Sequence, residues 1–120
     1  MARRVGLLTL VSAAFALVAG GCGGTTAASF DSPTWKEPVK YCAKSPRADM
    51  VDDLVAQNLK AGMPMQDVRA LLGPPDATDG PSVSYYYVGF DQTSLLGDCI
   101  LLEVEANDGQ LRRAVVVRDG

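Results

Sequence analysis

Apolar residues between positions 45 and 73 recur at intervals of three and four, which is the spacing of an amphipathic helix. The spacing predicts a first helix over about Pro46–Lys60 and a shorter second helix that ends before Gly73. Ser45 is a suitable N-cap and Pro46 a suitable first helical residue, because the N–H that proline lacks would have no helical partner. The apolar stripes consist of Met50, Val51, Leu54, Val55 and Leu59 in the first helix and of Met65, Val68, Leu71 and Leu72 in the second.

Glycine and proline mark the helix ends in the stretch "GMPMQDVRALLGPP" at 62–75. Gly62 and Gly73 can adopt the left-handed conformation with which many helices end. Pro74 and Pro75 have no N–H and disfavour helical geometry in the residue before them, so the second helix must stop there. The stretch therefore predicts a corner of the fold and not a catalytic motif.

After the polar segment "DATDGP", which predicts a turn, the hydrophobic period changes from about 3.6 to 2. Three runs rich in β-branched and aromatic residues predict strands: "SVSYYYVGF", "CILLEVEA" and "LRRAVVVR". The last two flank "NDGQ", a strong hairpin signal. The predicted fold class is α+β, with two N-terminal helices packed on one face of a three-stranded antiparallel sheet.

Alternation along the first predicted strand places Tyr85 and Tyr87 on one face and Tyr86 on the other. The connection from Gly89 to Asp98 is too long for a tight hairpin turn, and loops of that length often carry binding. We therefore expect this loop to be a candidate interaction surface.

The first 21 residues have the pattern of a signal peptide. Arg3 and Arg4 precede an uncharged apolar run over 5–19, which is shorter than the roughly 20 residues of a membrane span. Small residues then stand directly before Cys22, an arrangement that resembles a bacterial lipobox. The resemblance implies lipidation of the Cys22 thiol and cleavage before it; cleavage by ordinary signal peptidase, which would leave Cys22 as a thiol, is the alternative.

This processing divides the chain into a signal peptide (1–21), a Gly-, Ser-, Thr- and Pro-rich tether (22–44) and a folded domain (45–120). Several acyl chains on one residue would make a durable membrane anchor. Gly23 stands where an aspartate would signal inner-membrane retention, so the expected location is the periplasmic face of the outer membrane. In the tether, Phe30, Trp35 and Tyr41 are spaced by five and six residues, which suggests that its second half docks onto the domain.

Export also bears on the remaining cysteines, because disulfides persist outside the cytosol. With Cys22 assigned to lipid, Cys42 and Cys99 form an even pair, and a bond between them would stabilise a small domain by roughly 4 kcal/mol at most. Two unpaired thiols are the alternative. A metal site or redox pair is disfavoured, since the sequence has no His and no CxxC motif.

Residues 22–120 contain 9 Lys and Arg against 14 Asp and Glu, a net charge of −5. Such an acidic chain has no electrostatic footprint for nucleic acid. Asp49, Asp52 and Asp53 lie in the first two turns of the predicted first helix, where its dipole stabilises carboxylates. Hard cations usually need more oxygen ligands than these three supply, so we expect no metal or other cofactor.

The serines offer no nucleophile for catalysis. Ser82, Ser84 and Ser94 have no neighbouring base and no nucleophile-elbow context. Because the sequence lacks His, any general base would have to be a carboxylate. We therefore expect a protein that is not an enzyme.

A Gly-Met pair, a helix ending in Leu-Leu-Gly-Pro-Pro, a Tyr-rich strand and a terminal hairpin at Asp-Gly, all behind a lipobox, resemble the BamE/SmpA/OmlA group of outer-membrane lipoproteins. The wider class is similar to the β-lactamase-inhibitor-protein-like fold. The resemblance covers about residues 51–117. It rests on Gly62, Met63, Val68, Leu71, Leu72, Gly73, Pro75, Tyr85 to Val88 and Gly109.

These matching residues are structural, so the resemblance implies architecture more than a binding site. One departure is Pro64, which stands where the group usually has a Ser or Thr N-cap; we expect it to be the first residue of the second helix. The implied function is a non-enzymatic envelope lipoprotein that serves as an accessory of the machinery inserting β-barrel proteins. An inhibitor-like or ligand-binding module that uses the exposed sheet face is the alternative.

Overall fold

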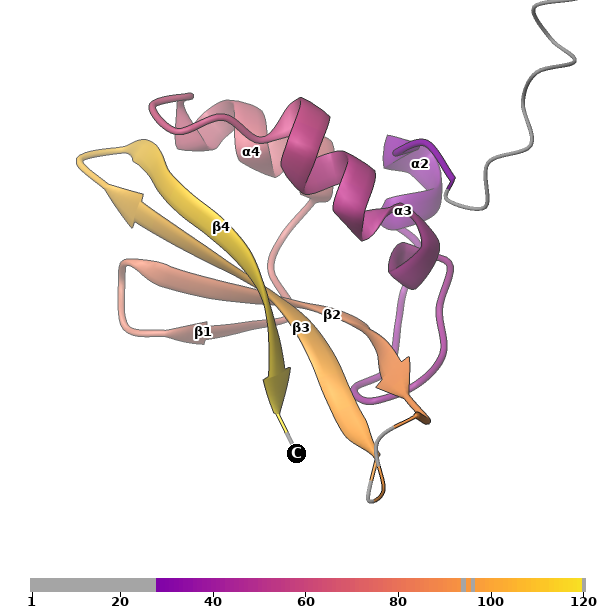
Figure 1. The fold of residues 1–120 in the computed structure, drawn as a ribbon. Coiled ribbons are helices and arrows are strands. Elements are labelled where there is room, and N and C mark those ends of the chain that lie inside the picture. Colours follow the sequence, from indigo (N-terminus) through magenta and orange to yellow (C-terminus); the bar gives the residue numbers. More distant parts are fainter. Residues whose placement is uncertain (1–27, 94, 96, 120) are drawn as a thin grey trace, which may run out of the picture.

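The computed structural model describes residues 28–93, 95 and 97–119. The predicted signal peptide (1–21) and the predicted lipidation site Cys22 lie outside these residues. The helices are α2 (Ser32–Trp35), α3 (Arg47–Asp53), the π-helical segment η1 (Leu54–Asn58) and α4 (Met65–Leu72); the strands are β1 (Ala77–Asp79), β2 (Val83–Asp91), β3 (Asp98–Asn107) and β4 (Gln110–Asp119). The helices α2, α3 and α4 lie together on one side of the sheet (Figure 1).

The sheet is an antiparallel meander in the order β1-β2-β3-β4. This confirms the α+β class with helices preceding an antiparallel sheet, but the predicted number of three strands is wrong. The fourth strand, β1, lies in the segment expected to be a turn and pairs Ala77 with Tyr85 and Asp79 with Val83. Three residues without apolar alternation give no strand signal in a sequence, so β1 depends on its pairing with β2.

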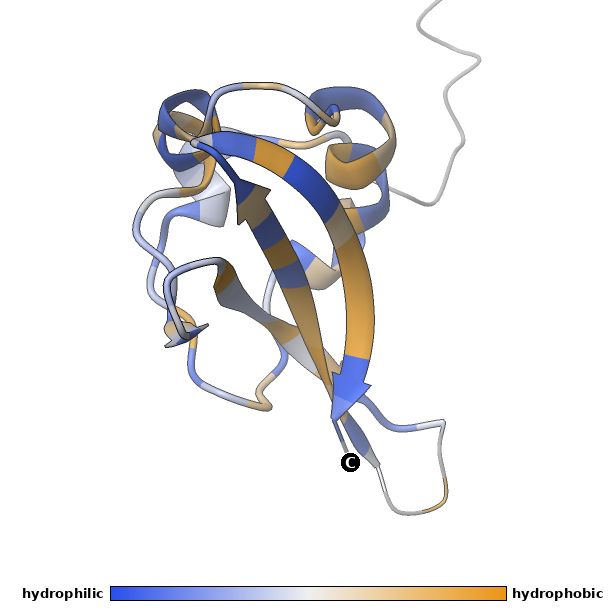
Figure 2. Cartoon of the chain, turned by 90° about the vertical axis from the view of Figure 1, so that its left-hand side faces the viewer, coloured by the Kyte–Doolittle hydropathy of each residue, from blue (hydrophilic) through white to orange (hydrophobic). Residues whose placement is uncertain are grey.

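Asp108 and Gly109 form the predicted turn between β3 and β4, with φ of 54° and 76°. Positive φ at both positions is the geometry of a type I′ hairpin turn, which suits the right-handed twist of the flanking strands. Hydrophobic and hydrophilic positions alternate in the second half of β3, whereas β4 has a continuous hydrophobic run over 114–117 (Figure 2). The side chains of both strands still form two sets, because successive residues of a strand point to opposite faces of the sheet. One set faces the helices and the other faces away from them.

The hydrophobic core lies between the helices and this first set of strand positions. Both predicted apolar stripes contribute to it, and Tyr86 and Val88 enter it from β2 as the alternation predicts. The buried members are Trp35, Met50, Val51, Leu54, Leu59, Val68, Leu72, Tyr86, Val88, Leu102, Val104 and Leu111. None of the helices in the described part of the chain is long and apolar enough to cross a membrane.

The first predicted helix is present but shorter and less regular than expected. It begins at Arg47 instead of Pro46, and its final turn is π-helical, with the N–H of Leu59 bonded to the carbonyl of Leu54 at 3.0 Å. The Oγ of Ser45 accepts the N–H of Arg47 at 3.1 Å, as a capping serine does. The same hydroxyl donates to the carbonyl of Val88 at 2.6 Å and so ties the helix start to β2.

The expectation that Pro64 opens the second helix is wrong. Pro64 has φ −63° and ψ 138°, an extended conformation, and the helix starts at Met65. Pro64 instead forms an isolated bridge to Gln110 at the start of β4, and the N–H of Gly62 donates to the carbonyl of Leu111 at 2.7 Å. The segment between the helices therefore pairs with the edge of β4, which is why an extended proline is suitable there.

A third helix, α2, lies in the segment assigned to the tether. Asp31 caps it by accepting the N–H of Thr34 at 3.1 Å. Trp35, its last residue, has an exposed fraction of 0% and packs at 6.3 Å from the ring of Tyr86. The Oγ of Ser32 also donates to the carbonyl of Leu71 at 2.6 Å. Residues 28–35 are therefore packed against the rest of the domain, with Trp35 in its core.

Candidate functional site

The face of the sheet turned away from the helices is the candidate functional site, and we call it the open face. In the strand register, Tyr85 on β2 lies opposite Glu103 on β3, which in turn lies opposite Val115 on β4. One step along, Tyr87 lies opposite Leu101, and Leu101 opposite Val117. Because side chains alternate across a sheet, these two rows share one face. The open face therefore carries aromatic and aliphatic side chains where a solvated sheet face usually carries polar ones.

A hollow of about 470 Å³ lies on the open face. Leu101, on the central strand β3, is 9% exposed and is flanked by Tyr87 and Val117. Tyr41 contributes from outside the sheet, since its ring packs edge-on against Tyr87 at 5.3 Å between centroids. The residues lining the hollow are Tyr41, Ala77, Thr78, Tyr85, Tyr87, Leu101, Glu103, Val117 and Asp119.

A disulfide between Cys42 and Cys99 holds Tyr41 at this face. The two Cα atoms are 4.6 Å apart, and the bond joins positions 57 residues apart in the sequence. This confirms the predicted pairing over the alternative of two free thiols. Tyr41 is the residue before Cys42, and its hydroxyl donates to Oδ2 of Asp119 at 2.7 Å. The long loop between α2 and α3 thus reaches the far end of β2 and supplies one wall of the hollow (Figure 1).

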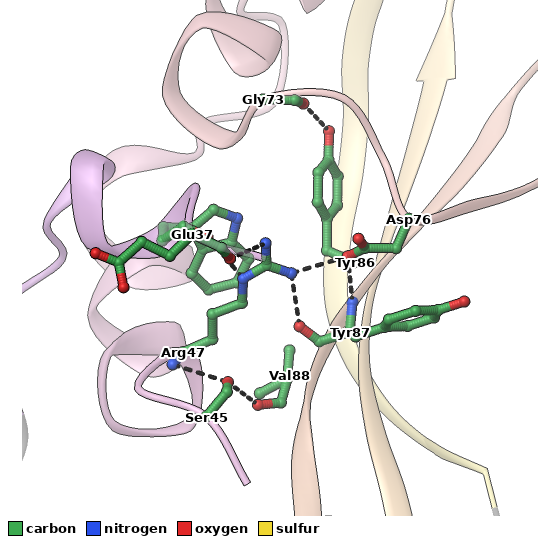
Figure 3. Close-up of polar contacts among 9 residues, drawn as sticks. Glu37, Ser45, Arg47, Gly73, Asp76, Tyr86, Tyr87 and Val88 are labelled. Carbon is green, nitrogen blue, oxygen red and sulfur yellow. Dashed lines mark hydrogen bonds and ion pairs between the residues drawn. The ribbon is translucent and has the colours of Figure 1, made fainter. Parts of the chain in front are cut away.

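The backbone of Tyr87 is held by a polar network at the outer edge of the same strand (Figure 3). β1 pairs only with residues up to Tyr85, so the outer edge of β2 has no strand neighbour beyond that point. Arg47 Nη1 donates to the Tyr87 carbonyl at 2.8 Å, and Oδ2 of Asp76 accepts the Tyr87 N–H at 2.9 Å. Arg47 and Asp76 also form an ion pair at 2.8 Å. These side chains replace the missing strand and hold the backbone of the residue that carries the ring.

The electrostatics of the hollow are acidic. A hydrogen bond to Asp119 raises the pKa of Tyr41, and partial burial together with the negative charge of Glu103 raises the pKa of Tyr85. At neutral pH both phenols therefore remain protonated and act as hydrogen-bond donors. The ionisable groups among the described residues lining the hollow are three tyrosines and two carboxylates, which offer hydrogen-bond donors and acceptors to a ligand.

Several of the Asp and Ser residues considered from the sequence for metal binding or catalysis make hydrogen bonds within the fold. Asp53 Oδ2 accepts the N–H of Phe30 at 2.8 Å, and the Asp49 carbonyl accepts the N–H of Ala28 at 3.1 Å, so α3 holds the segment before α2. Ser84 is buried and its Oγ accepts from Arg69 at 3.3 Å. Ser94 lies outside the described residues.

The loop expected over 89–98 is shorter than predicted. Phe90 pairs with Cys99 and Asp91 with Asp98, so the connection between β2 and β3 covers only 92–97. At its described position 95, Leu95 is 98% exposed. None of the described residues of this loop lines the hollow, whose lining comes from the sheet and from Tyr41.

Glu103 and Asp119 line the hollow, although the sequence did not predict them as site residues. The strand pattern of β3 and β4 was visible in the sequence, but no local signal indicated that Tyr41 would lie between Tyr87 and Asp119.

Within residues 28–93, 95 and 97–119, no group of three or more His, Cys, Asp or Glu side chains is placed to hold a metal ion. Comparisons with protein-family models, with curated proteins and with solved structures found no match to this chain.

Proposed function

We propose that this chain is a non-enzymatic lipoprotein of the cell envelope that presents the open face of its sheet to a partner protein. The lipid on Cys22 would anchor it to the periplasmic face of the outer membrane. In the role that the sequence resemblance favours, the protein steadies a larger assembly there, with the machinery that inserts β-barrel proteins as the first candidate partner.

The open face is the single observation that carries this proposal. The helices cover the other face, while Tyr85, Tyr87, Val115 and Val117 remain partly accessible beside a hollow. Aromatic residues are enriched where proteins bind one another, because a ring buries much surface at little conformational cost. An accessible face of this composition is typical of an interaction site.

The frame around the open face is rigid, which also favours recognition. A disulfide fixes one wall, and the Arg47–Asp76 network fixes the strand that carries Tyr87. A surface that is already in its binding conformation loses less entropy on association. A tethered protein further gains from a high local concentration of partners in the same membrane.

Mild crosslinking in intact cells, followed by affinity recovery of the full tagged chain, tests the proposal. Recovery of barrel-assembly components would support the accessory role. Recovery of no envelope protein, under conditions that recover other lipoproteins of that machinery, would contradict it. A Cys22→Ser variant serves as a matched control, since the loss of its anchor should reduce recovery without changing the open face.

The hollow favours one second candidate, an inhibitor-like or ligand-binding module that uses the same face. Its volume of about 470 Å³ lies within the usual range of small-ligand sites. Micromolar binding to an exported hydrolase in an inhibition screen, together with the failure of crosslinking to recover an assembly, would favour this second function over the first.

A further inference from the structure

The hollow on the open face combines aromatic rings with carboxylates. Tyr41, Tyr85 and Tyr87 supply the rings, and Glu103 and Asp119 supply the charges. Among the residues that the structure describes, none of those lining it carries a positive charge. The face of an aromatic ring attracts cations, and a neighbouring carboxylate adds a hydrogen-bond acceptor of the same preference.

Among the described residues, the ion pairs at the hollow involve the carboxylate of Glu103 and not that of Asp119. Arg113 approaches Glu103 at 3.5 Å and Glu105 at 3.3 Å, and Arg112 pairs with Glu105 at 2.7 Å. Both arginines are 58% exposed, so their pairs lie at the solvated rim. Asp119 is different, because its side-chain oxygen accepts from a neutral group, the hydroxyl of Tyr41. Negative potential therefore remains at the Tyr41 end of the hollow.

Both carboxylates of the hollow also help to raise the pKa of a neighbouring tyrosine. Asp119 is the main cause of the raised pKa of Tyr41, and Glu103 is the second cause, after burial, of the raised pKa of Tyr85. The negative charges of Asp119 and Glu103, which contribute to both raised pKa values, would attract a cation to the hollow. The same two carboxylates line the hollow beside the aromatic rings, so both the position and the charge of these groups favour a cationic ligand.

We propose that the hollow receives an arginine side chain from a basic segment of the partner protein. The proposal rests on the proposed function and names the chemistry of the partner. A guanidinium is planar, so it can stack on the Tyr87 ring while its N–H groups donate to a carboxylate. Lysine has a compact charge and cannot do both. The hollow is larger than one side chain, which leaves room for the backbone on either side of the arginine.

Peptide binding to the purified full chain in detergent micelles tests this chemistry. The probe is acetyl-Gly-Arg-Gly-amide, and its matched control replaces arginine by citrulline, which has nearly the same shape but no charge. Saturation-transfer NMR of the peptide reports the dissociation constant and the side-chain protons in contact with the protein. We expect the arginine peptide to bind at least tenfold more tightly than the citrulline peptide, and its binding to weaken as salt rises.

A Glu103→Gln/Asp119→Asn double variant should lose most of this preference, so that both peptides bind alike. Asp108→Asn, at the hairpin tip away from the hollow, removes a negative charge elsewhere and should leave arginine binding within twofold of wild type. If the double variant does not fold, the salt dependence and the arginine-to-citrulline ratio of the wild type decide the question. Equal binding of the two peptides, or no binding of either, overturns the proposal; so does tighter binding of spermidine, which would assign the hollow to a small organic cation.

Crosslinking separates this inference from the proposed function. If a partner is recovered equally by wild type and by the double variant, the arginine site is wrong and the envelope-accessory role stands. If no partner is recovered while the arginine peptide binds as expected, the proposed function is wrong and the cation site stands.

Discussion

The guanidinium of Arg47 lies 4.8 Å from the ring centroid of Trp35, and its Nε donates to the Trp35 carbonyl at 2.8 Å. A residue that begins α3 is thereby joined to the one that ends α2. Arg47 is only 4% exposed, and its Nη1 also donates to Asp76 and to the carbonyl of Tyr87. One side chain of α3 thus links α2 to β2, the strand that contributes Tyr85 and Tyr87 to the open face.

Replacing Arg47 by alanine should therefore be strongly destabilising. Removing a buried charged partner of this kind costs about 3–5 kcal/mol, because the partly buried Asp76 and three carbonyls lose their donor. Urea denaturation monitored by circular dichroism measures the change. Arg112→Ala is the control, since its exposed pair with Glu105 should contribute under about 1 kcal/mol. Similar losses for the two variants would show that the Arg47 network is not a structural element.

Trp35→Ala should destabilise the domain by about 3–5 kcal/mol, as expected when a fully buried aromatic side chain leaves a cavity. The measurement is the free energy of unfolding of the full chain in urea. Phe30, which is partly buried beside Trp35, provides a milder comparison in Phe30→Ala. An unchanged stability in Trp35→Ala would mean that residues 28–35 are a tether and not part of the core.

Reduction of the Cys42–Cys99 disulfide should lower the free energy of unfolding by about 2–4 kcal/mol. The Cys42→Ser/Cys99→Ser double variant should show the same loss without reductant. A thiol count on the denatured, unreduced protein should find neither of these cysteines free. Two free thiols at these positions would contradict the structure.

Alkaline pH should weaken the fold through Tyr86. Burial raises the pKa of this phenol from 10.0 to about 12, and its hydroxyl donates to the carbonyl of Gly73 at 2.9 Å. The folded state prefers the neutral phenol, so the stabilisation is complete below pH 10 and is lost as pH rises toward 12. Thermal unfolding followed from pH 8 to pH 12 should show this loss, and Tyr86→Phe should show less of it. Equal pH dependence in both proteins would contradict the assignment.

Periodicity predicted the parts of the fold whose cause is local. The stripe from Met50 to Leu59, the stop at Gly73 and the turn at Asp108–Gly109 all depend on neighbours within a few residues. Gly73 ends the helix as predicted, and its N–H bonds to the carbonyl of Arg69, but with φ 77° and ψ −170° it is not in the expected left-handed conformation. This backbone geometry is also one that glycine alone adopts readily. Alternation also placed Tyr86 in the core and Tyr87 on the opposite face.

The misses have long-range causes. β1 and the bridge at Pro64 exist because β2 and β4 offer unpaired backbone groups to segments distant in sequence. The four residues of α2 are too few for a periodic signal, although Asp31 before a proline-containing turn was a capping signal that could have been used. Tyr41 reaches the open face because Cys42 is bonded to Cys99, and no local pattern shows which surface a disulfide will bring together. The hollow is therefore a property of the tertiary structure.

Site-specific photocrosslinking tests the central claim, that the open face is the surface that binds a partner. A benzophenone amino acid replaces Tyr87 in the full chain, in intact cells, and the control places it at Gln66, which is exposed on the helix α4. We expect a covalent adduct with an envelope protein from position 87 and little or none from position 66. Adducts from position 66 alone, or equal adducts from both positions, would contradict it.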